Sequence, residues 1–357
     1  MKLLVTGGCG FIGSAVVRRI LRTTDWSVVN LDKLGYAAEP RALGETAADP
    51  RYRLVVGDIA DARLLARLFE EERPQAVLHL AAESHVDRSI DGPEAFLATN
   101  VVGTFRLLEA ALAHWRRLAE PERARFRFHH VSTDEVFGAL GPDDPPFRET
   151  TAYDPRSPYA ASKAASDHFV RAFGHTFGLP VLLSNASNNY GPWQFPEKLI
   201  PLALAKALAG EPIPLYGRGD QVRDWLHVED HAAALLAILT RGEVGRTYLV
   251  GARAERTNLA LVHTLCAILD ELLPDSPHRP HARLVRFVAD RPGHDRRYAI
   301  DPSRLERELG WRPSRSLEEG LRETVRWYLE NRAWLAETRR RYDGRRLGLG
   351  TAAEGRP

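Results

Sequence analysis

The sequence predicts an α/β protein with a doubly wound parallel sheet and a smaller, mixed α/β C-terminal domain. Short buried strands alternate with amphipathic helices over the first half of the chain. A glycine-rich stretch, residues 7–13, joins the first strand to the first helix, and Asp32 ends the second strand about 20 residues later. This order of strand, glycine loop, helix and acid is typical of a Rossmann-type sheet.

The composition is that of an ordinary globular protein. The 357 residues can bury a sizeable core, and 44% are hydrophobic and 27% charged. The net charge is only +2, with acids and bases interspersed, so we expect no nucleic-acid or membrane partner. Cys9 and Cys266 are too few for a disulfide framework or a zinc site, and the N-terminus resembles neither a signal peptide nor a membrane span. We therefore predict a cytoplasmic protein without a bound metal.

The elements of the sheet follow in order along the chain. Buried strands are predicted at residues 2–6, 27–31, 52–56, 76–80, 126–131 and 181–184. The first helix places Val16, Val17, Ile20 and Leu21 at helical spacing. A second helix, from about Thr99, directs Val102, Phe105, Leu108 and Ala111 towards a packing surface, and a third runs from Tyr159 through Phe173.

The apolar character thins after residue 184. Residues 188–192 and 195–201 are predicted as an ordered loop, strands at 213–216 and 247–250, and helices at 231–240, 258–269 and about 317–328. Residues 1–183 plus about 222–250 would form the nucleotide-binding domain. Residues 184–221 plus about 251–335 would form the second domain, and 344–357 a disordered tail.

The glycine loop has the spacing that a dinucleotide site needs. Gly7 allows a tight turn, Gly10 lets the backbone approach a pyrophosphate, and Gly13 lets the helix pack closely on the strand. The helix N-terminus then offers free amides and a positive dipole end to the phosphates. Taken alone, the loop could also be a glycine-rich turn of purely structural use.

Asp32 indicates which dinucleotide would fit. An acid at the end of the second strand binds ribose hydroxyls and repels a 2′-phosphate, so the sequence predicts NAD rather than NADP. Asp58 and Ile59, after the third strand, could bracket the adenine. Ala81 and Ala82, after the fourth, are small enough for the backbone to pass close to a flat cofactor.

Two further groups of polar residues are candidates for a functional site, one at the end of a strand and one on a helix. Thr133, Asp134 and Glu135 end the fifth strand, where ligands gather in an open parallel sheet. Tyr159 and Lys163 lie four residues apart, on one helix face, where the ammonium group could stabilise a phenolate. Each group has a structural alternative: a surface turn capped by Ser or Asp, and a surface Tyr–Lys pair.

The roles of other polar residues stay open. His85 could be a ligand, but a lone histidine in a loop is more often polar surface. Candidate phosphate-binding residues, with solvated surface as the alternative in so arginine-rich a chain, are Arg223, Arg286, Arg291, Arg296 and Arg297.

Two motifs resemble the extended short-chain dehydrogenase/reductase superfamily: Thr6-Gly7-Gly8-x-Gly10-Phe11-Ile12-Gly13 and Tyr159-x-x-x-Lys163. Further stretches are similar to the dTDP-glucose 4,6-dehydratase family within it: 32–36, 132–136, 187–192, 194–201, 221–225 and 290–295. The resemblance extends from the first residues to about residue 330. The sequence departs from the family pattern at Phe137, Ala139, Arg218 and Asp220, none of which is a catalytic position.

The resemblance also implies which individual residues bind the cofactor and the substrate. NAD would be bound by Gly7, Gly10, Phe11, Ile12, Gly13, Asp32, Lys33, Leu34, Gly35, Asp58, Ile59, Leu80, Ala81, Ala82, Ser84, Thr99, Tyr159, Lys163 and Asn189. The substrate, dTDP-glucose, would be bound by Ser84, Thr133, Asn188, Lys198, Leu199, Pro214, Tyr216, Arg223, Asn258, Asp290, Arg291 and His294. A homodimer is also implied, through helices near residues 100–115 and 159–175.

The implied reaction uses five catalytic residues. Tyr159, kept ionised by Lys163, would remove the proton of the sugar's 4-hydroxyl while hydride passes from C4 to NAD, and Thr133 would hydrogen-bond that oxygen. Glu135 would then take the C5 proton, and protonated Asp134 would donate to the departing 6-hydroxyl, so that water leaves. A UDP-sugar 4-epimerase or decarboxylase, or a non-catalytic NAD sensor of the same fold, stays open as an alternative.

Overall fold

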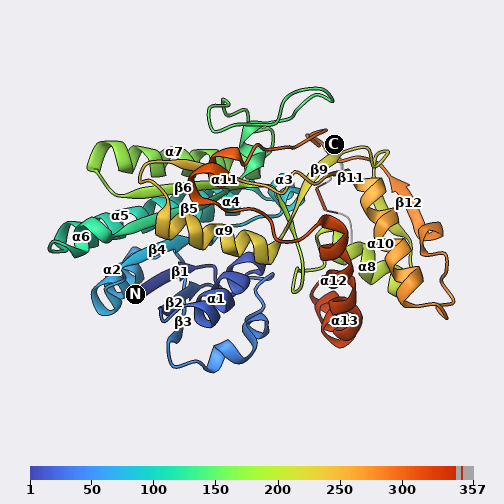
Figure 1. Cartoon of the computed structure of the whole chain (residues 1–357), viewed down its shortest axis with the longest axis horizontal. Coiled ribbons are helices and arrows are strands. Elements are labelled where there is room, and N and C mark those ends of the chain that lie inside the picture. The colour runs from blue at the N-terminus through green and yellow to red at the C-terminus, as the bar shows by residue number, and fades with distance from the viewer. Residues whose placement is uncertain (343–346, 349–357) are drawn as a thin grey trace, which may run out of the picture.

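A seven-stranded parallel sheet forms the larger part of the molecule (Figure 1). The computed structural model describes residues 1–342, 347 and 348. The strand order, β10-β6-β5-β4-β1-β2-β3, reverses direction between β1 and β4, as in a Rossmann-type sheet. Its strands are β1 (Lys2–Thr6), β2 (Ser27–Asp32), β3 (Tyr52–Val56), β4 (Ala76–His79), β5 (Arg127–Thr133), β6 (Val181–Ala186) and β10 (Thr247–Val250).

Both faces of this sheet are covered by helices, because successive strand residues point to opposite sides. On β1, Leu4 enters a core shared with α2, α5 and α7, whereas Leu3 and Val5 enter a core shared with α1 and α9. The helices are α1 (Phe11–Thr23), α2 (Ala62–Glu72), α3 (Val86–Asp91), α4 (Pro93–Phe96), α5 (Thr104–Arg117), α6 (Glu122–Arg125), α7 (Pro158–Phe177) and α9 (Val228–Arg241). Three further turns are η1 (Pro40–Ala48), the π-helical η2 (Leu97–Gly103) and η3 (Asp134–Phe137).

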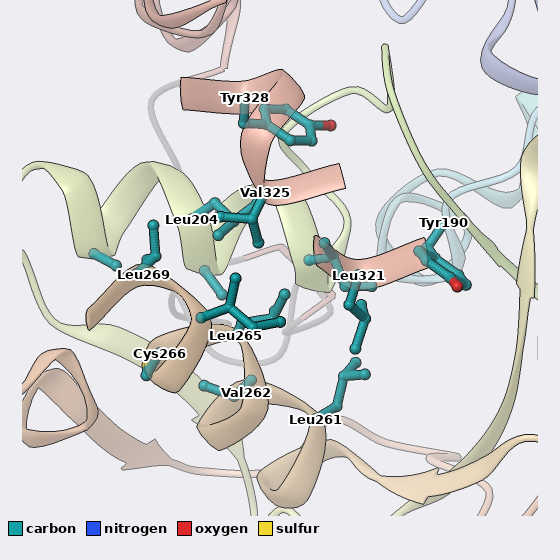
Figure 2. Close-up of a cluster of buried hydrophobic side chains, with 14 of the residues drawn as sticks. Tyr190, Leu204, Leu261, Val262, Leu265, Cys266, Leu269, Leu321, Val325 and Tyr328 are labelled. Carbon is teal, nitrogen blue, oxygen red and sulfur yellow. The ribbon is translucent and has the colours of Figure 1, made fainter. Parts of the chain in front are cut away.

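A second, smaller part lies to the right in Figure 1 and has its own core. Figure 2 shows that core, where Leu265 of α10 faces Leu204 of α8 and Val325 of α12, and Leu261 of α10 lies next to Leu321 of α12. Its strands are β7 (Asn188–Tyr190), β8 (Ile213–Tyr216), β9 (Val222–His227), β11 (Glu255–Thr257) and β12 (Val285–Val288). Its helices are α8 (Leu199–Leu208), α10 (Asn258–Leu272), η4 (His281–Leu284), α12 (Leu317–Glu330) and α13 (Arg332–Arg341), with α11 (Ser303–Leu309) beside β10 and α9.

The predicted fold class is confirmed, and the bounds of β1, β3, β8 and β10 are those predicted. The prediction of a loop over 188–192 and 195–201 was partly wrong. Residues 188–190 form β7, which pairs with the distant β9, and α8 begins at Leu199. Val102 is 43% exposed rather than packed, since the π-helical turn η2 rotates the helix face before α5. The predicted tail lies outside the described residues, apart from positions 347 and 348.

One helical stretch of the described chain, Pro93–Arg117, is long and apolar enough to cross a membrane by length and composition alone. Half of its most apolar window is buried within the fold, where α5 packs on α2 and α7. A core helix meets the same criteria, so this observation is weak evidence for a membrane span.

Candidate active site

A cavity of 330 Å³ opens at the carboxyl ends of the parallel strands. Every residue predicted to bind NAD lines it except Leu34, which is 38% exposed beside it. The predicted catalytic residues Thr133, Asp134, Glu135, Tyr159 and Lys163 line the same cavity. The structure therefore brings together groups that lie far apart in the chain, as a topological switch point requires.

The glycine loop fits a dinucleotide because side chains cannot occupy it. A Cβ on Gly7, whose φ is +74°, would lie 2.7 Å from the Ala81 nitrogen, and a Cβ on Gly13 would lie 2.1 Å from the Gly7 carbonyl oxygen. No side chain caps α1 at Gly10, so its first amides remain available to an anion in the cavity. The backbone thus provides a cradle for a pyrophosphate.

Asp32 is held at the cavity wall by the same loop. Its carboxylate accepts hydrogen bonds from the Cys9 and Leu34 amides, both at 2.8 Å. Burial raises the pKa of Asp32, although these hydrogen bonds act in the opposite direction. Each oxygen keeps a second lone pair, which suits a carboxylate that would bind ribose hydroxyls.

The π-helical turn η2 contributes the opposite wall. Thr99 accepts a hydrogen bond from Lys33 Nζ at 3.1 Å, and Lys33 also pairs with Glu83 at 2.7 Å. Asn100 forms hydrogen bonds of 2.8 to 3.0 Å with the backbone of Glu83 and with the Ser162 hydroxyl on α7. Isolated π-turns often occur at functional sites, and here the turn fixes residues that line the cavity.

The end of β5 turns directly into η3. Thr133 Oγ1 caps this turn by accepting from the Glu135 amide at 3.2 Å, and it donates to Asp134 Oδ1 at 3.3 Å. The turn is therefore capped by Thr133 rather than by the Ser or Asp of the structural alternative, and it is not on the surface. Asp134 is 1% exposed and its Oδ2 has no hydrogen-bond partner among the described residues.

The two carboxylates differ in their surroundings. Burial, followed by the charge of Glu135, raises the pKa of Asp134 well above its usual range. Burial also raises the pKa of Glu135, but Arg291, Arg223 and Lys198 oppose that rise. Asp134 is thus the carboxyl group that keeps its proton, and Glu135 is the one that ionises more readily.

Helix α7 positions Tyr159 and Lys163. Ser157 caps the helix through the Ala160 amide at 3.0 Å, and Pro158 begins it. Burial, then Glu135, raises the pKa of Tyr159, and a hydrogen bond with Thr133 lowers it. Lys163 Nζ donates to the Val131 carbonyl at 3.0 Å, and burial lowers its pKa to about 8.

Only some of the predicted substrate residues line the cavity. Ser84, Thr133, Asn188 and Lys198 do, whereas the others do not: Leu199, Pro214, Tyr216, Arg223, Asn258, Asp290, Arg291 and His294. Within this group Asp290 pairs with His294 at 2.6 Å, and Tyr216 donates to Asp87 at 2.8 Å.

The candidate arginines separate into two kinds. Arg223 is 5% exposed, donates to the Asp295 carbonyl at 2.9 Å and lies 4.2 Å above the Tyr298 ring. Arg291 pairs with Asp87 at 2.6 Å. Arg286 and Arg296 are exposed, as the surface alternative predicted, whereas Arg297, whose side chain is 12% exposed, pairs with Glu255.

Several residues at the site were missed by sequence reasoning. Glu197 accepts from Tyr36 at 2.9 Å and from Arg88 at 3.1 Å, and His231 contacts Asn189 at 2.9 Å. Their partners are far away in the chain, so no local pattern marks them. His85 is a buried N-cap of α3 rather than surface.

None of the residues that depart from the family pattern lines the cavity. Phe137 stacks on Phe147 with ring centroids 5.2 Å apart, in a buried cluster. Arg218 and Asp220 are exposed and do not line the cavity. Among the described residues, no group of His, Cys, Asp or Glu has the arrangement of a metal site.

The parallel sheet, glycine cradle and Tyr159–Lys163 pair define an NAD-dependent enzyme of the short-chain dehydrogenase/reductase type. The sequence model of a family described as GDP-mannose 4,6 dehydratase matches residues 4–324. The dTDP-glucose 4,6-dehydratase of Salmonella typhimurium is 54% identical over 343 residues, which cover 94% of each chain. This chain belongs to that wider family and, within it, to the dTDP-glucose 4,6-dehydratases.

Solved structures of related enzymes have the same fold as this chain. A dTDP-glucose 4,6-dehydratase from Streptomyces venezuelae, crystallised with NAD, is 46% identical with a TM-score of 0.85, and the match covers 95% of this chain and 100% of that one. A UDP-glucose 4-epimerase from Thermotoga maritima, solved with UDP-glucose, is 28% identical with a TM-score of 0.80, covering 93% and 99%. The architecture is therefore shared more widely than the dehydratase sequence.

Proposed function

We propose that this chain converts dTDP-glucose to dTDP-4-keto-6-deoxyglucose and water, with NAD as its cofactor, in deoxysugar biosynthesis. The proposal depends above all on one observation: Asp134 and Glu135 lie beside Thr133 and Tyr159 in a single cavity. Oxidation of a sugar hydroxyl needs one base, whereas loss of water across C5 and C6 also needs an acid and a second base. The two carboxylates supply that additional pair.

The different surroundings of the carboxylates support different roles. Asp134 is buried and retains its proton, so it can donate to the departing 6-hydroxyl. Glu135 faces Arg291, Arg223 and Lys198, which favour its ionised form, so it can accept the C5 proton. Two neighbouring titratable groups whose environments separate their pKa values are typical of an acid and a base working in one site.

The oxidation step is assigned to Tyr159, Thr133 and Lys163. When bound, NAD accepts a hydride from C4 of the sugar and later returns it to C6. Tyr159 takes the proton of the 4-hydroxyl, and Thr133, which hydrogen-bonds to Tyr159, holds the same sugar oxygen. Because burial and Glu135 both oppose ionisation of Tyr159, the positive charge of Lys163 on the same helix face is needed to favour the phenolate.

We assign NAD to the cavity wall formed by the glycine loop, Asp32, Asp58 and the turn η2. The nucleotide sugar is assigned to Asn188, Lys198 and the polar group around Arg223 and Arg291. The cations of that group suit a diphosphate.

The alternatives fit this site less well. A 4-epimerase shares Tyr159 and Lys163 but has no use for Asp134 and Glu135. An NAD sensor has no need of a phenol paired with a buried lysine. Neither alternative explains why β5 is followed by a buried carboxylic acid with one oxygen that has no hydrogen-bond partner among the described residues.

The test is incubation of the purified protein with dTDP-glucose and no added NAD. Alkali treatment of the 4-keto-6-deoxy product gives an ultraviolet absorbance, which we expect for the wild type and for the control Glu122→Gln, an exposed acid on α6. We expect Glu135→Gln to lose this activity. No product from the wild type, or full activity of Glu135→Gln, would overturn the proposal, and UDP-glucose assayed in parallel for conversion at C4 identifies an epimerase.

We also propose that the chain forms a homodimer through α5, η2 and α7. Large apolar side chains are exposed on these elements: Leu97 at 57%, Val102 at 43%, Phe169 at 39% and Phe177 at 42%. Phe105 links the two helices, with its ring centroid 5.7 Å from that of Phe169. Exposed apolar patches of this kind mark interaction sites. Sedimentation of Phe169→Glu at the monomer mass, against a wild-type dimer, checks the assignment.

A cytoplasmic location is proposed as well. Cys9 and Cys266 are both free and buried, which suits a reducing compartment. Fractionation of cells that express the chain tests this location.

A further inference from the structure

Three functional groups stand on one face of α7. Tyr159, Lys163 and Asp167 are spaced four residues apart, so they lie above one another on the helix. The first two line the cavity, whereas Asp167 does not. Asp167 is 0% exposed, and a buried carboxylate is costly unless it is paired.

One oxygen of Asp167 is fully engaged by hydrogen-bond donors. Oδ2 accepts from Ser132 Oγ at 2.9 Å, from Tyr153 Oη at 2.8 Å and from Asn185 Nδ2 at 3.2 Å. Burial alone would raise the pKa of Asp167, but the pKa is lowered, first by the contact with His130, then by the charge of Lys163 and by the hydrogen bond from Ser132. Arg171 donates to the same Tyr153 oxygen at 2.8 Å.

The other oxygen of Asp167 lies near His130, which in turn lies near Lys163. Oδ1 of Asp167 lies 3.2 Å from His130 Nε2, and this nitrogen lies 3.3 Å from Lys163 Nζ. Asp167, His130 and Lys163 are all nearly fully buried, at 0%, 0% and 3% exposure. One imidazole nitrogen thus lies near both groups. In the neutral ring it can accept from the ammonium group or donate to the carboxylate, but not both at once, so the two charges act on each other across a short distance.

The groups that face Lys163 from each neighbouring element can be compared. His79 of β4 and His130 of β5 are buried, which lowers their pKa values, that of His130 to about 4, so both are neutral near pH 7. Tyr159 shares the helix. Asp134 and Glu135 of η3 act on Tyr159, because their charges raise its pKa. Asp167 is the group whose charge raises the pKa of Lys163 against burial.

We propose that Asp167 is a positioning residue for the reaction, which keeps the Lys163 ammonium group charged and in place so that Tyr159 can lose its proton. This role rests on the proposed function and deepens it. Asp167 touches neither the cavity nor the groups assigned to the sugar, and it acts through Lys163. The hydride-transfer half of the reaction thus depends on a carboxylate buried between α7 and the sheet.

The test is the pH profile of Asp167→Asn. Without the carboxylate, the pKa of Lys163 falls further, so the ammonium group loses its charge at lower pH. We expect the alkaline limb of kcat to move down by about one pH unit, with KM for dTDP-glucose unchanged. An alkaline limb that stays at its wild-type position would overturn the proposal.

A double-mutant cycle separates this role from a purely structural one. Single-turnover reduction of bound NAD is measured in Asp167→Asn, in Lys163→Met and in the combined variant. If Asp167 acts through Lys163, Asp167→Asn slows reduction in the wild-type background and has no further effect beside Lys163→Met. Equal slowing in both backgrounds would contradict the role.

Tyr153→Phe gives an independent route should Asp167→Asn not fold. It removes one donor but keeps the carboxylate, so the pKa of Asp167 rises. The acidic limb of single-turnover NAD reduction, a step in which Glu135 takes no proton, then moves to higher pH while the alkaline limb stays in place. An unchanged acidic limb counts against the proposal. Wild-type protein inactive on dTDP-glucose would instead refute the proposed function itself, which separates the two failures.

Discussion

Asp87 Oδ1 lies 2.6 Å from Nη1 of Arg291, and this ion pair joins α3 to the segment that follows β12. Both side chains are largely buried, at 6% and 15% exposure. Tyr216 donates to the second oxygen of Asp87 at 2.8 Å. Because Arg291 also opposes the rise in the pKa of Glu135, the pair fixes a cation that the elimination step uses.

Asp87→Ala should therefore weaken both stability and activity. Removing one partner of a buried pair leaves Arg291 uncompensated, and the expected loss in the free energy of unfolding is about 3 kcal/mol. Chemical denaturation measures this loss. Arg322→Ala, which breaks an exposed pair with Glu271, is the matched control and should change the stability by less than about 1 kcal/mol. Equal effects of the two variants would argue against a buried, functional pair.

Asp134→Asn should separate oxidation from elimination. The amide cannot supply the proton to the 6-hydroxyl, so product formation is expected to slow by roughly a hundredfold or more. Reduction of bound NAD, followed by absorbance in a single turnover, should persist because Tyr159, Thr133 and Lys163 are unchanged. A variant that no longer reduces NAD would contradict this division of roles.

The same substitution should change how stability depends on pH. The pKa of Asp134 is raised in the folded protein, so its stabilising contribution is complete below the unfolded value of about 3.9 and is lost as pH rises through the folded pKa. An asparagine side chain at this position does not titrate. Asp134→Asn is thus expected to be more stable than the wild type at neutral to alkaline pH, with the difference shrinking towards acid. Urea denaturation at several pH values checks the sign.

Leu265→Ala should destabilise the C-terminal core. Leu265 is 1% exposed and packs among side chains of α8 and α12 (Figure 2), so the expected loss is about 2 to 5 kcal/mol. Val244→Ala, at a site 41% exposed, is the control and should have little effect. Thermal unfolding monitored by circular dichroism compares them, and a small loss for Leu265→Ala would mean that the core can collapse around the gap.

Much of the sheet and its ligand site could be predicted from the sequence. Buried parallel strands are continuous apolar runs, and Gly7 and Gly13 mark positions where a Cβ cannot fit. Since such strands end at one edge, Asp32 and Thr133 could be placed together without knowing the tertiary contacts.

The remainder depends on partners that are distant in the sequence. Strand β9 was missed because it carries charges into the interior: Asp224 accepts from the Ala252 and Ala254 amides, and Arg223 lies on the Tyr298 ring. Glu197 is buried where Tyr36, 161 residues away, and Arg88, 109 residues away, donate to its carboxylate. Neither hydrophobic periodicity nor a local motif predicts contacts between residues so far apart in the chain.

The acid and the base that we propose for the elimination lie in one turn, η3, which is four residues long. Tyr159 and Lys163, which we assign to the oxidation step, stand on α7, and the glycine loop forms the cradle proposed for the cofactor. The reaction type can therefore change through two adjacent codons while cofactor binding is preserved. This separation gives a simple route by which one scaffold could diverge, or be redesigned, from dehydration to plain oxidation and reduction.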